Sequence, residues 1–320
     1  MAVNSNFDVL TTTTLKNYRK TMEDNIFTAN PLFYWLKSKG KMKVDNTGGT
    51  QIICPLMYGK NSTAKSYAGY DVIDVIPQEG MSAAEYDWAQ YAVGISISGI
   101  EEFKNSGDAQ MINLLQAKIK QAEMSLIDLM ADDLFATSQV ATALNTLKLM
   151  VSDDGTGTIG NISADTYTWW KNNYASGAST AVVFDNLIGT IFTQLLAASK
   201  GNDRPDIGIA GSTVYSGLEA QLIKTINFVP QLKNTSMANV GYDNYMVKGT
   251  TIMYDENCTA GQMYLLNTKY LELVTGAGKD FVSTPWIKPD NGDYKTSMIL
   301  WYGNLVCSNR ARQAKVVTIT

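Results

Sequence analysis

Few residues in this sequence have the types and spacing that catalysis or cofactor binding needs. The segment Gly155-Thr-Gly157-Thr-Ile-Gly160 matches the G-x-G-x-x-G pattern of dinucleotide-binding loops. However, Ser152-Asp153-Asp154 precede it directly, and two carboxylates would repel a pyrophosphate at that position. No good strand pattern leads into the segment and no helix opens at its third glycine. We therefore interpret it as a plain loop.

A second motif, Ser62-x-x-Lys65, has the spacing found in penicillin-recognising enzymes. It lies in a loop rich in tyrosine and glycine rather than at a helix start, and its usual Lys-Thr-Gly companion motif is missing. The carboxylate pairs Asp132-Asp133 and Asp153-Asp154 are adjacent in sequence. Because neighbouring helical residues do not face one another, such pairs do not converge on one point and indicate a solvated face.

The 320-residue chain contains no histidine and only three cysteines, Cys54, Cys258 and Cys307. The lack of histidine excludes Ser-His-Asp and Cys-His nucleophiles and histidine-ligated metals. The dispersed cysteines form no C-x-x-C pair, and they favour reduced thiols in a cytoplasmic setting. We therefore expect no catalytic residue, no cofactor and no metal. Any response to acid must come from carboxylates, whose ordinary pKa values lie near about 4.

Charge is sparse and unevenly distributed. Lysine and arginine number 26 against 30 acidic residues, for a net charge of −4, which argues against strong nucleic-acid binding by the whole molecule. Residues 1–45 hold seven basic and four acidic side chains, whereas residues 101–137 hold three basic and seven acidic side chains. These zones are either solvated faces or surfaces where the basic end of one subunit meets the acidic middle of another. We find no signal peptide and no apolar run of about 18 residues.

Hydrophobic periodicity predicts the elements of the first half of the chain. A polar arm over 1–14 leads into a helix over about 15–26. Asn30-Pro31 then begin a strongly apolar helix, with asparagine as N-cap, that stops near Gly40. Residues 43–58, broken at Gly48-Gly49, and residues 86–99 look like strands and flank a loose loop over 59–85.

A long helix is predicted over about 105–137, and at 1.5 Å per residue it would span about 50 Å. Its apolar stripe consists of Ile112, Leu115, Ile119, Ala122, Leu126 and Leu129. Residues 141–268 alternate between strand and helix patterns and indicate an α/β subdomain, with a strand at 207–210 and helices capped by Asp185 and Ser212. The remainder is mostly β, with strands over 250–254, 263–267, 270–274, 296–306 and 315–320 and a turn over 289–293.

Aromatic side chains crowd the region of the loose loop. Tyr67, Tyr70, Tyr86, Trp88 and Tyr91 lie within 25 residues of one another. Tyrosine and tryptophan are enriched at protein interfaces, and an isolated hairpin is not stable alone. We therefore favour an interface here over local packing.

The order and spacing of several motifs resemble the major capsid proteins of tailed bacteriophages. The similarity covers nearly the whole chain. The motifs run from an N-terminal arm through an extended loop and a spine helix to an axial domain: Thr13-Thr14-Leu15, Asn30-Pro31-Leu32, Gly48-Gly49-x-x-Ile52, Pro55-Leu56-x-Tyr58, Tyr67-x-Gly69-Tyr70-Asp71, Ile97-Ser98-Gly99-x-Glu101-Glu102, Thr158-Ile159-Gly160-Asn161-Ile162, Trp169-Trp170-Lys171-Asn172 and Arg204-Pro205-Asp206-Ile207. One departure is the missing charged scaffold segment before the arm, which implies a separate scaffolding protein or no need for one.

The resemblance implies an α+β, Hong-Kong-97-like major capsid fold. Its expected parts are an N-terminal arm with short helices (1–42), an extended loop with strands into the peripheral domain (43–99, tip about 59–85), the spine helix of the peripheral domain (100–140), an axial domain (141–268), and return strands of the peripheral domain with the C-terminus (269–320). The implied function is not enzymatic. Copies would assemble in the host cytoplasm into hexamers and pentamers of an icosahedral virion capsid.

Expected partners are further copies of the chain, packaged double-stranded DNA bound non-specifically, a portal, and separate scaffolding or decoration proteins, with no membrane. Candidate contacts between subunits are Tyr58, Lys65, Tyr67, Tyr70, Asp71, Glu85, Trp88, Arg19, Lys20 and Asp290. Three alternatives remain: an encapsulin-like compartment without DNA, another structural protein such as a tail-tube subunit, and an enzyme that uses carboxylates. Because the loop has no core of its own, deleting 59–85 should leave a folded subunit that does not assemble.

Overall fold

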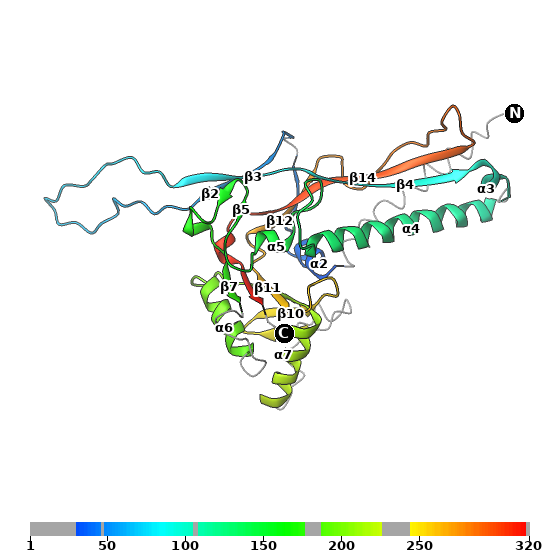
Figure 1. Ribbon diagram of the computed structural model, residues 1–320. Helices are drawn as coiled ribbons and strands as arrows, with labels where there is room; N and C mark the ends of the chain where they lie inside the picture. Colours follow the sequence, from blue (N-terminus) through cyan, green and yellow to red (C-terminus); the bar gives the residue numbers. More distant parts are fainter. Residues whose placement is uncertain (1–29, 46–47, 105–107, 177–186, 226–243, 318–320) are drawn as a thin grey trace.

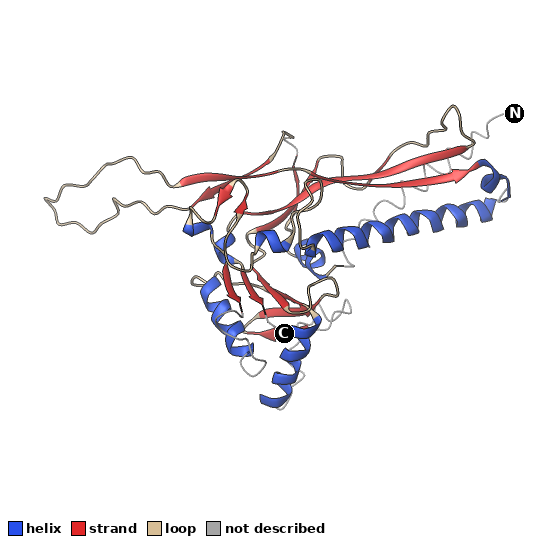
Figure 2. Ribbon diagram, viewed as in Figure 1, coloured by secondary structure: helices blue, strands red, loops and turns tan. Residues whose placement is uncertain are grey.

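The computed structural model describes residues 30–45, 48–104, 108–176, 187–225 and 244–317. They form an α+β fold, as predicted: a five-stranded sheet beside a long helix, a six-stranded sheet with two helices, and an extended hairpin that projects away from both (Figures 1 and 2). The predicted arm and the helix over about 15–26 lie outside the described residues.

The five-stranded sheet has the order β1-β12-β14-β13, and β4 also pairs with β14. Its strands are β1 (Met42–Asp45), β4 (Ala89–Ser98), β12 (Leu271–Gly276), β13 (Val282–Ser283) and β14 (Tyr294–Cys307). β1 is parallel to β12, and the other pairs are antiparallel. β4 pairs with β14 along its whole length, so the two strands form a long arm. The predicted turn over 289–293 precedes β14 directly.

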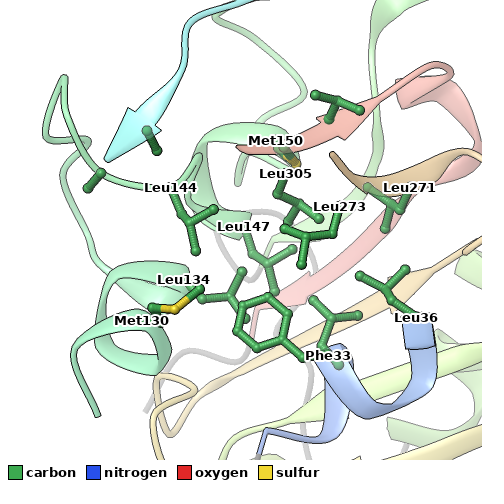
Figure 3. Close-up of a cluster of buried hydrophobic side chains, with 14 of the residues drawn as sticks. Phe33, Leu36, Met130, Leu134, Leu144, Leu147, Met150, Leu271, Leu273 and Leu305 are labelled. Atoms are coloured by element: carbon green, nitrogen blue, oxygen red, sulfur yellow. The ribbon is translucent and has the colours of Figure 1, made fainter. Parts of the chain in front are cut away.

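Helix α4 (Asp108–Phe135) lies along β4 and β14, and the short α3 (Gly99–Lys104) connects β4 to it (Figure 1). The predicted long helix is confirmed, and its stripe residues Ile119 and Leu126 are buried. The stripe is wrong at Leu129, which is 46% exposed, whereas Met130 and Leu134 are buried. The reason is that the last turns of α4 pack toward α2 (Pro31–Ser38) and α5 (Leu147–Met150), where Figure 3 places Met130 and Leu134.

The hairpin consists of β2 (Ile52–Met57) and β3 (Met81–Tyr86), and its tip covers residues 58–80 (Figure 1). The predicted tip over about 59–85 extends too far, because β3 pairs with β2 along its whole length. Ala84 is fully buried, and it fixes β3 against the body of the protein. The predicted strand over 86–99 therefore corresponds to β4, and a separate strand, β3, ends at its first residue, Tyr86. Gly48 and Gly49 both have positive φ, which confirms the predicted break.

The six-stranded sheet has the order β7-β15-β11-β8-β10-β9. Its strands are β7 (Asn173–Ser176), β8 (Ile207–Ala210), β9 (Asn244–Val247), β10 (Thr250–Tyr254), β11 (Gln262–Leu266) and β15 (Ala314–Val317). Helices α6 (Leu187–Ala198) and α7 (Ser212–Thr225) pack on one face. The strand at 207–210 and the helix from Ser212 are confirmed, and Asp185 lies outside the described residues. The sequence places β15 with the return strands of 269–320, whereas in the structure it lies inside this sheet between β7 and β11.

A continuous hydrophobic core joins the two sheets. It contains Ile207 and Ile209 from the six-stranded sheet together with Leu273 and Leu305 from the five-stranded sheet. Helix α2 (Pro31–Ser38) and the short α5 (Leu147–Met150) pack into the same core (Figure 3). The predicted start of α2 is confirmed, because the Asn30 side chain accepts a hydrogen bond from the backbone N–H of Leu32 at 2.9 Å.

Candidate interaction surfaces

The tip of the hairpin exposes a group of apolar side chains. Its exposed large apolar residues are Tyr58, Tyr67, Tyr70, Val72, Ile73, Val75 and Ile76. Monomeric proteins rarely expose large contiguous apolar patches, and such patches usually mark sites of interaction. The tip therefore presents the kind of surface that another chain covers.

Hydrogen bonds inside the tip hold its shape even though it has no core. Lys65 Nζ donates to the backbone oxygen of Val72 at 2.6 Å and lies 3.6 Å from Asp74 Oδ2. Ser62 Oγ donates to Gln78 Oε1 at 2.9 Å. The two residues of the Ser62-x-x-Lys65 motif therefore bond to different partners on the returning side of the loop. Ser62 bonds to Gln78, and Lys65 bonds to Val72 and Asp74.

The base of the hairpin is held by the segment that contains the G-x-G-x-x-G pattern. The strands β5 (Thr158–Ile159) and β6 (Ile162–Ser163) form a small hairpin with positive φ at Gly160 and Asn161, as a type I′ turn requires. Glu85 N–H donates to the Gly160 oxygen at 3.1 Å, and Glu85 Oε2 accepts from Asn161 Nδ2 at 2.8 Å. A Cβ at Gly160 would lie 2.7 Å from Ala84 Cβ. The third glycine thus permits close packing, and the plain-loop interpretation is wrong for 158–163.

Tyr58, another predicted contact residue, also has a partner within its own chain. Its ring stacks on Trp169 with 4.5 Å between centroids and 8° between planes. Trp169 belongs to a 3₁₀ helix, η1 (Thr168–Trp170), that follows β6. Tyr58 and Glu85 therefore tie the hairpin to its own subunit.

Two adjoining hollows lie where the hairpin meets the five-stranded sheet. The first, of about 520 Å³, lies among β1, β2 and β12. The second, of about 420 Å³, has walls that include Trp88, Tyr302 and Lys279, and both hollows include Asp45 and Gly48. Trp88 is fixed there, because its Nε1 donates to the Gly49 oxygen at 3.1 Å. The sequence did not single out Lys279 or Tyr302, which lie about two hundred residues after Trp88.

The remaining predicted contacts are widely separated. Tyr67, Tyr70 and Asp71 lie with Lys65 in the tip, whereas Asp290 is exposed in the turn before β14. Arg19 and Lys20 lie outside the described residues. The structure therefore brings together only the residues of the hairpin and its base.

Burial changes the acid–base chemistry of a few groups. Asp255 follows β10, and burial raises the pKa of its carboxyl to about 6, with a further contribution from Glu256. This corrects the expectation that the carboxylates titrate near their ordinary values. Burial also raises the pKa of the Cys54 thiol to about 11, and all three cysteines are free thiols.

Within the described ranges, no cluster of acidic or cysteine side chains has the composition of a metal site. No helix in that part of the chain combines the length and apolar character needed to cross a membrane.

The solved structures that align with this chain include viral and virus-like shells. A chain from the capsid asymmetric unit of cyanophage A-1(L) aligns with a TM-score of 0.63 at 18% identity, covering 88% of this chain and 92% of that one. A chain of the virus-like particle from Pyrococcus furiosus aligns with a TM-score of 0.51 at 12% identity, covering 94% of this chain and 98% of that one. A chain from the procapsid of satellite phage P4, which includes its size determination protein, also gives 0.51 at 12% identity, with 97% and 91% covered.

No family model and no curated protein matches the sequence. At these identities the similarity establishes the fold, and this chain has the Hong-Kong-97-like fold.

Proposed function

We propose that this chain is a major capsid protein whose copies form hexamers and pentamers of an icosahedral shell around double-stranded DNA. The observation that carries the proposal is the hairpin tip, whose apolar side chains are exposed in the single subunit. In a shell, a neighbouring subunit would cover them. Repeated head-to-tail contacts of this kind close into rings when the rotation between subunits permits.

The shell fold of the three related structures supports this proposal. The function would consist of contacts between chains rather than catalysis. DNA would be enclosed without sequence-specific binding, and a portal and separate scaffolding or decoration proteins would complete the particle. Its location would be the virion capsid, after assembly in the host cytoplasm.

A shortened hairpin tests the proposal. Tyr58 N–H and Gly59 N–H both donate to the Gly80 oxygen, at 2.9 and 3.3 Å, so the two ends of the tip are adjacent. Residues 60–79 can therefore be replaced by an Asn-Gly turn. A deletion of 59–85 would also remove the buried Ala84 of β3. We expect rings or shells of the unmodified protein in electron micrographs, and a folded monomer of the shortened variant by circular dichroism and sedimentation.

The matched control is Lys60→Gln, which changes one exposed side chain of the tip and leaves its length intact. This variant should assemble normally. If the unmodified protein stays monomeric at high concentration in every buffer, the proposed function is wrong. Normal assembly of the shortened variant would show that the tip is not the contact that builds the shell.

A compartment shell without DNA is a second candidate, favoured by the similarity to the Pyrococcus furiosus particle. The two candidate functions differ in what the particle encloses. Particles isolated from the natural source should contain nuclease-protected double-stranded DNA and absorb strongly at the nucleic-acid maximum if the chain is a capsid protein. Particles that contain only protein would favour the compartment.

A further inference from the structure

The hairpin tip presents one fully solvent-exposed tyrosine from a hydrogen-bonded turn. Tyr70 has a relative exposure of 104%, the highest among the exposed large apolar residues of the described chain. It lies in a turn closed by two hydrogen bonds of 2.8 Å, from Asp71 N–H to the Ala68 oxygen and from Ala68 N–H to Asp71 Oδ2. Holding the backbone of a loop in one turn before binding lowers the entropy cost of ordering it on association. Tyr70 therefore has the properties of a binding anchor.

The smaller hollow at the hairpin base is lined by residues that suit an aromatic side chain. Its walls include the aromatic rings of Trp88 and Tyr302, and its volume of about 420 Å³ is sufficient for an aromatic side chain. Exposed Lys279 lies at the wall, with its Nζ 5.4 Å from the centroid of the Tyr302 ring. Gln90 and Asp45 also line this hollow. Binding energy at interfaces is concentrated where aromatic anchors fill such pockets.

We propose that Tyr70 of one subunit inserts between Trp88 and Tyr302 of a second copy, where the adjacent Asp71 pairs with Lys279. This inference rests on the function proposed above, because it requires copies placed side by side. The tip lies at the far end of the hairpin from β1 and β14 (Figure 1), so it does not fill the hollow of its own subunit. The opposite charges of Asp71 and Lys279 fix the direction of insertion.

Alanine variants of two tyrosines in the same tip test the anchor. Tyr70→Ala should raise the protein concentration needed for assembly by about tenfold or more, because a central aromatic anchor is removed. Tyr67→Ala, which removes the same side chain from a less exposed position, should have a much smaller effect. Equal effects of the two variants would overturn the assignment of Tyr70.

Disulfide trapping tests the pocket itself. Gly69 adjoins Tyr70, and a Cβ at Gly69 or at Gly94 would meet no atom within 4 Å, so cysteine fits at both positions. Gly69→Cys combined with Ala277→Cys, at the wall of the hollow, should give covalently linked subunits when assembled protein is oxidised by copper-phenanthroline and dissolved oxygen. Gly69→Cys combined with Gly94→Cys, farther along β4, is the matched control, and single-cysteine variants give the background.

The outcomes separate this inference from the proposed function. Linkage at position 277 and not at 94 supports insertion into the hollow. Shells that link at 94, or at neither position, would overturn the inference while the proposed function stands. If the protein with native residues forms no shells, the proposed function itself fails.

Discussion

The Asp255 carboxylate is buried beside the N-terminal end of α2. Asn30 Nδ2 donates to its Oδ2 at 3.4 Å, and Asn257 N–H donates to its Oδ1 at 3.0 Å. Burial nevertheless raises the pKa of Asp255 from 3.8 to about 6, so removal from water outweighs these two contacts. The folded protein therefore holds a proton on Asp255 at a pH where the unfolded chain has released it.

The sign of the resulting pH dependence follows from linkage. Because the pKa of Asp255 is higher in the folded state, its contribution to stability increases as the pH falls from neutral through about 6. From about pH 7 to 4.5, unmodified protein should gain about 2 kcal/mol in unfolding free energy relative to Asp255→Asn. Urea unfolding of both proteins, in the shortened-hairpin monomer, measures the difference. Parallel pH profiles would contradict the prediction.

The extended hairpin is anchored by a distant segment of the chain. The turn of the β5–β6 hairpin bonds to Glu85, and Trp169 of η1 stacks on Tyr58. The chain therefore rigidifies the base of the hairpin and leaves the tip exposed. A rigid base with an exposed tip suits a binding surface that must be held at a defined angle. If the base were mobile, binding would cost the conformational entropy of that motion.

Removing one ring should loosen this anchor without unfolding the subunit. We expect Trp169→Ala to lose the stacking contribution of about 0.5–1.5 kcal/mol and to speed trypsin cleavage after Lys60 and Lys65. Trp169→Phe, which retains an aromatic face, should be cleaved more slowly than the alanine variant. Mass spectrometry of the fragments identifies the sites. Unchanged cleavage rates in Trp169→Ala would show that the stack does not restrain the hairpin.

The two sheets share one core. The inner face of the six-stranded sheet contributes Ile207, Tyr264 and Leu266 to the core that also contains Leu273 and Trp301. A second cluster fills the opposite face of that sheet under α6 and α7. Separating the sheets would expose the shared core to water, so they should unfold together.

We therefore expect a single unfolding transition for the shortened-hairpin monomer. All six tryptophans of the sequence lie outside the six-stranded sheet and its two helices, whereas circular dichroism reports both sheets. Coincident urea curves from tryptophan fluorescence and circular dichroism would indicate one cooperative unit. A circular-dichroism step without a fluorescence change would show that the six-stranded sheet unfolds independently.

Local features of the sequence predicted much of the secondary structure. Asn30-Pro31 identified the start of α2, the short apolar run at 207–210 identified the buried β8, and the break at Gly48-Gly49 is present. Such signals are readable because caps, turns and periodicity depend on residues within one or two turns of each other. The hairpin was also predicted, although its tip was placed too far along the chain because β3 has little strand character of its own.

The partners of these elements depend on contacts between segments that are distant in the sequence. Arg310 and Lys315 are fully buried although their residue types predict exposure. Arg310 donates from Nε to the Met150 oxygen at 2.8 Å, and Lys315 Nζ lies 2.6 Å from Asp153 Oδ1. These pairings join segments about 160 residues apart, so no local pattern reveals them. Local sequence signals indicated most of the helices and strands and the exposed hairpin, but they missed β3 and the β5–β6 hairpin. Long-range packing set which charges are buried and where β15 lies, because it depends on contacts between distant segments.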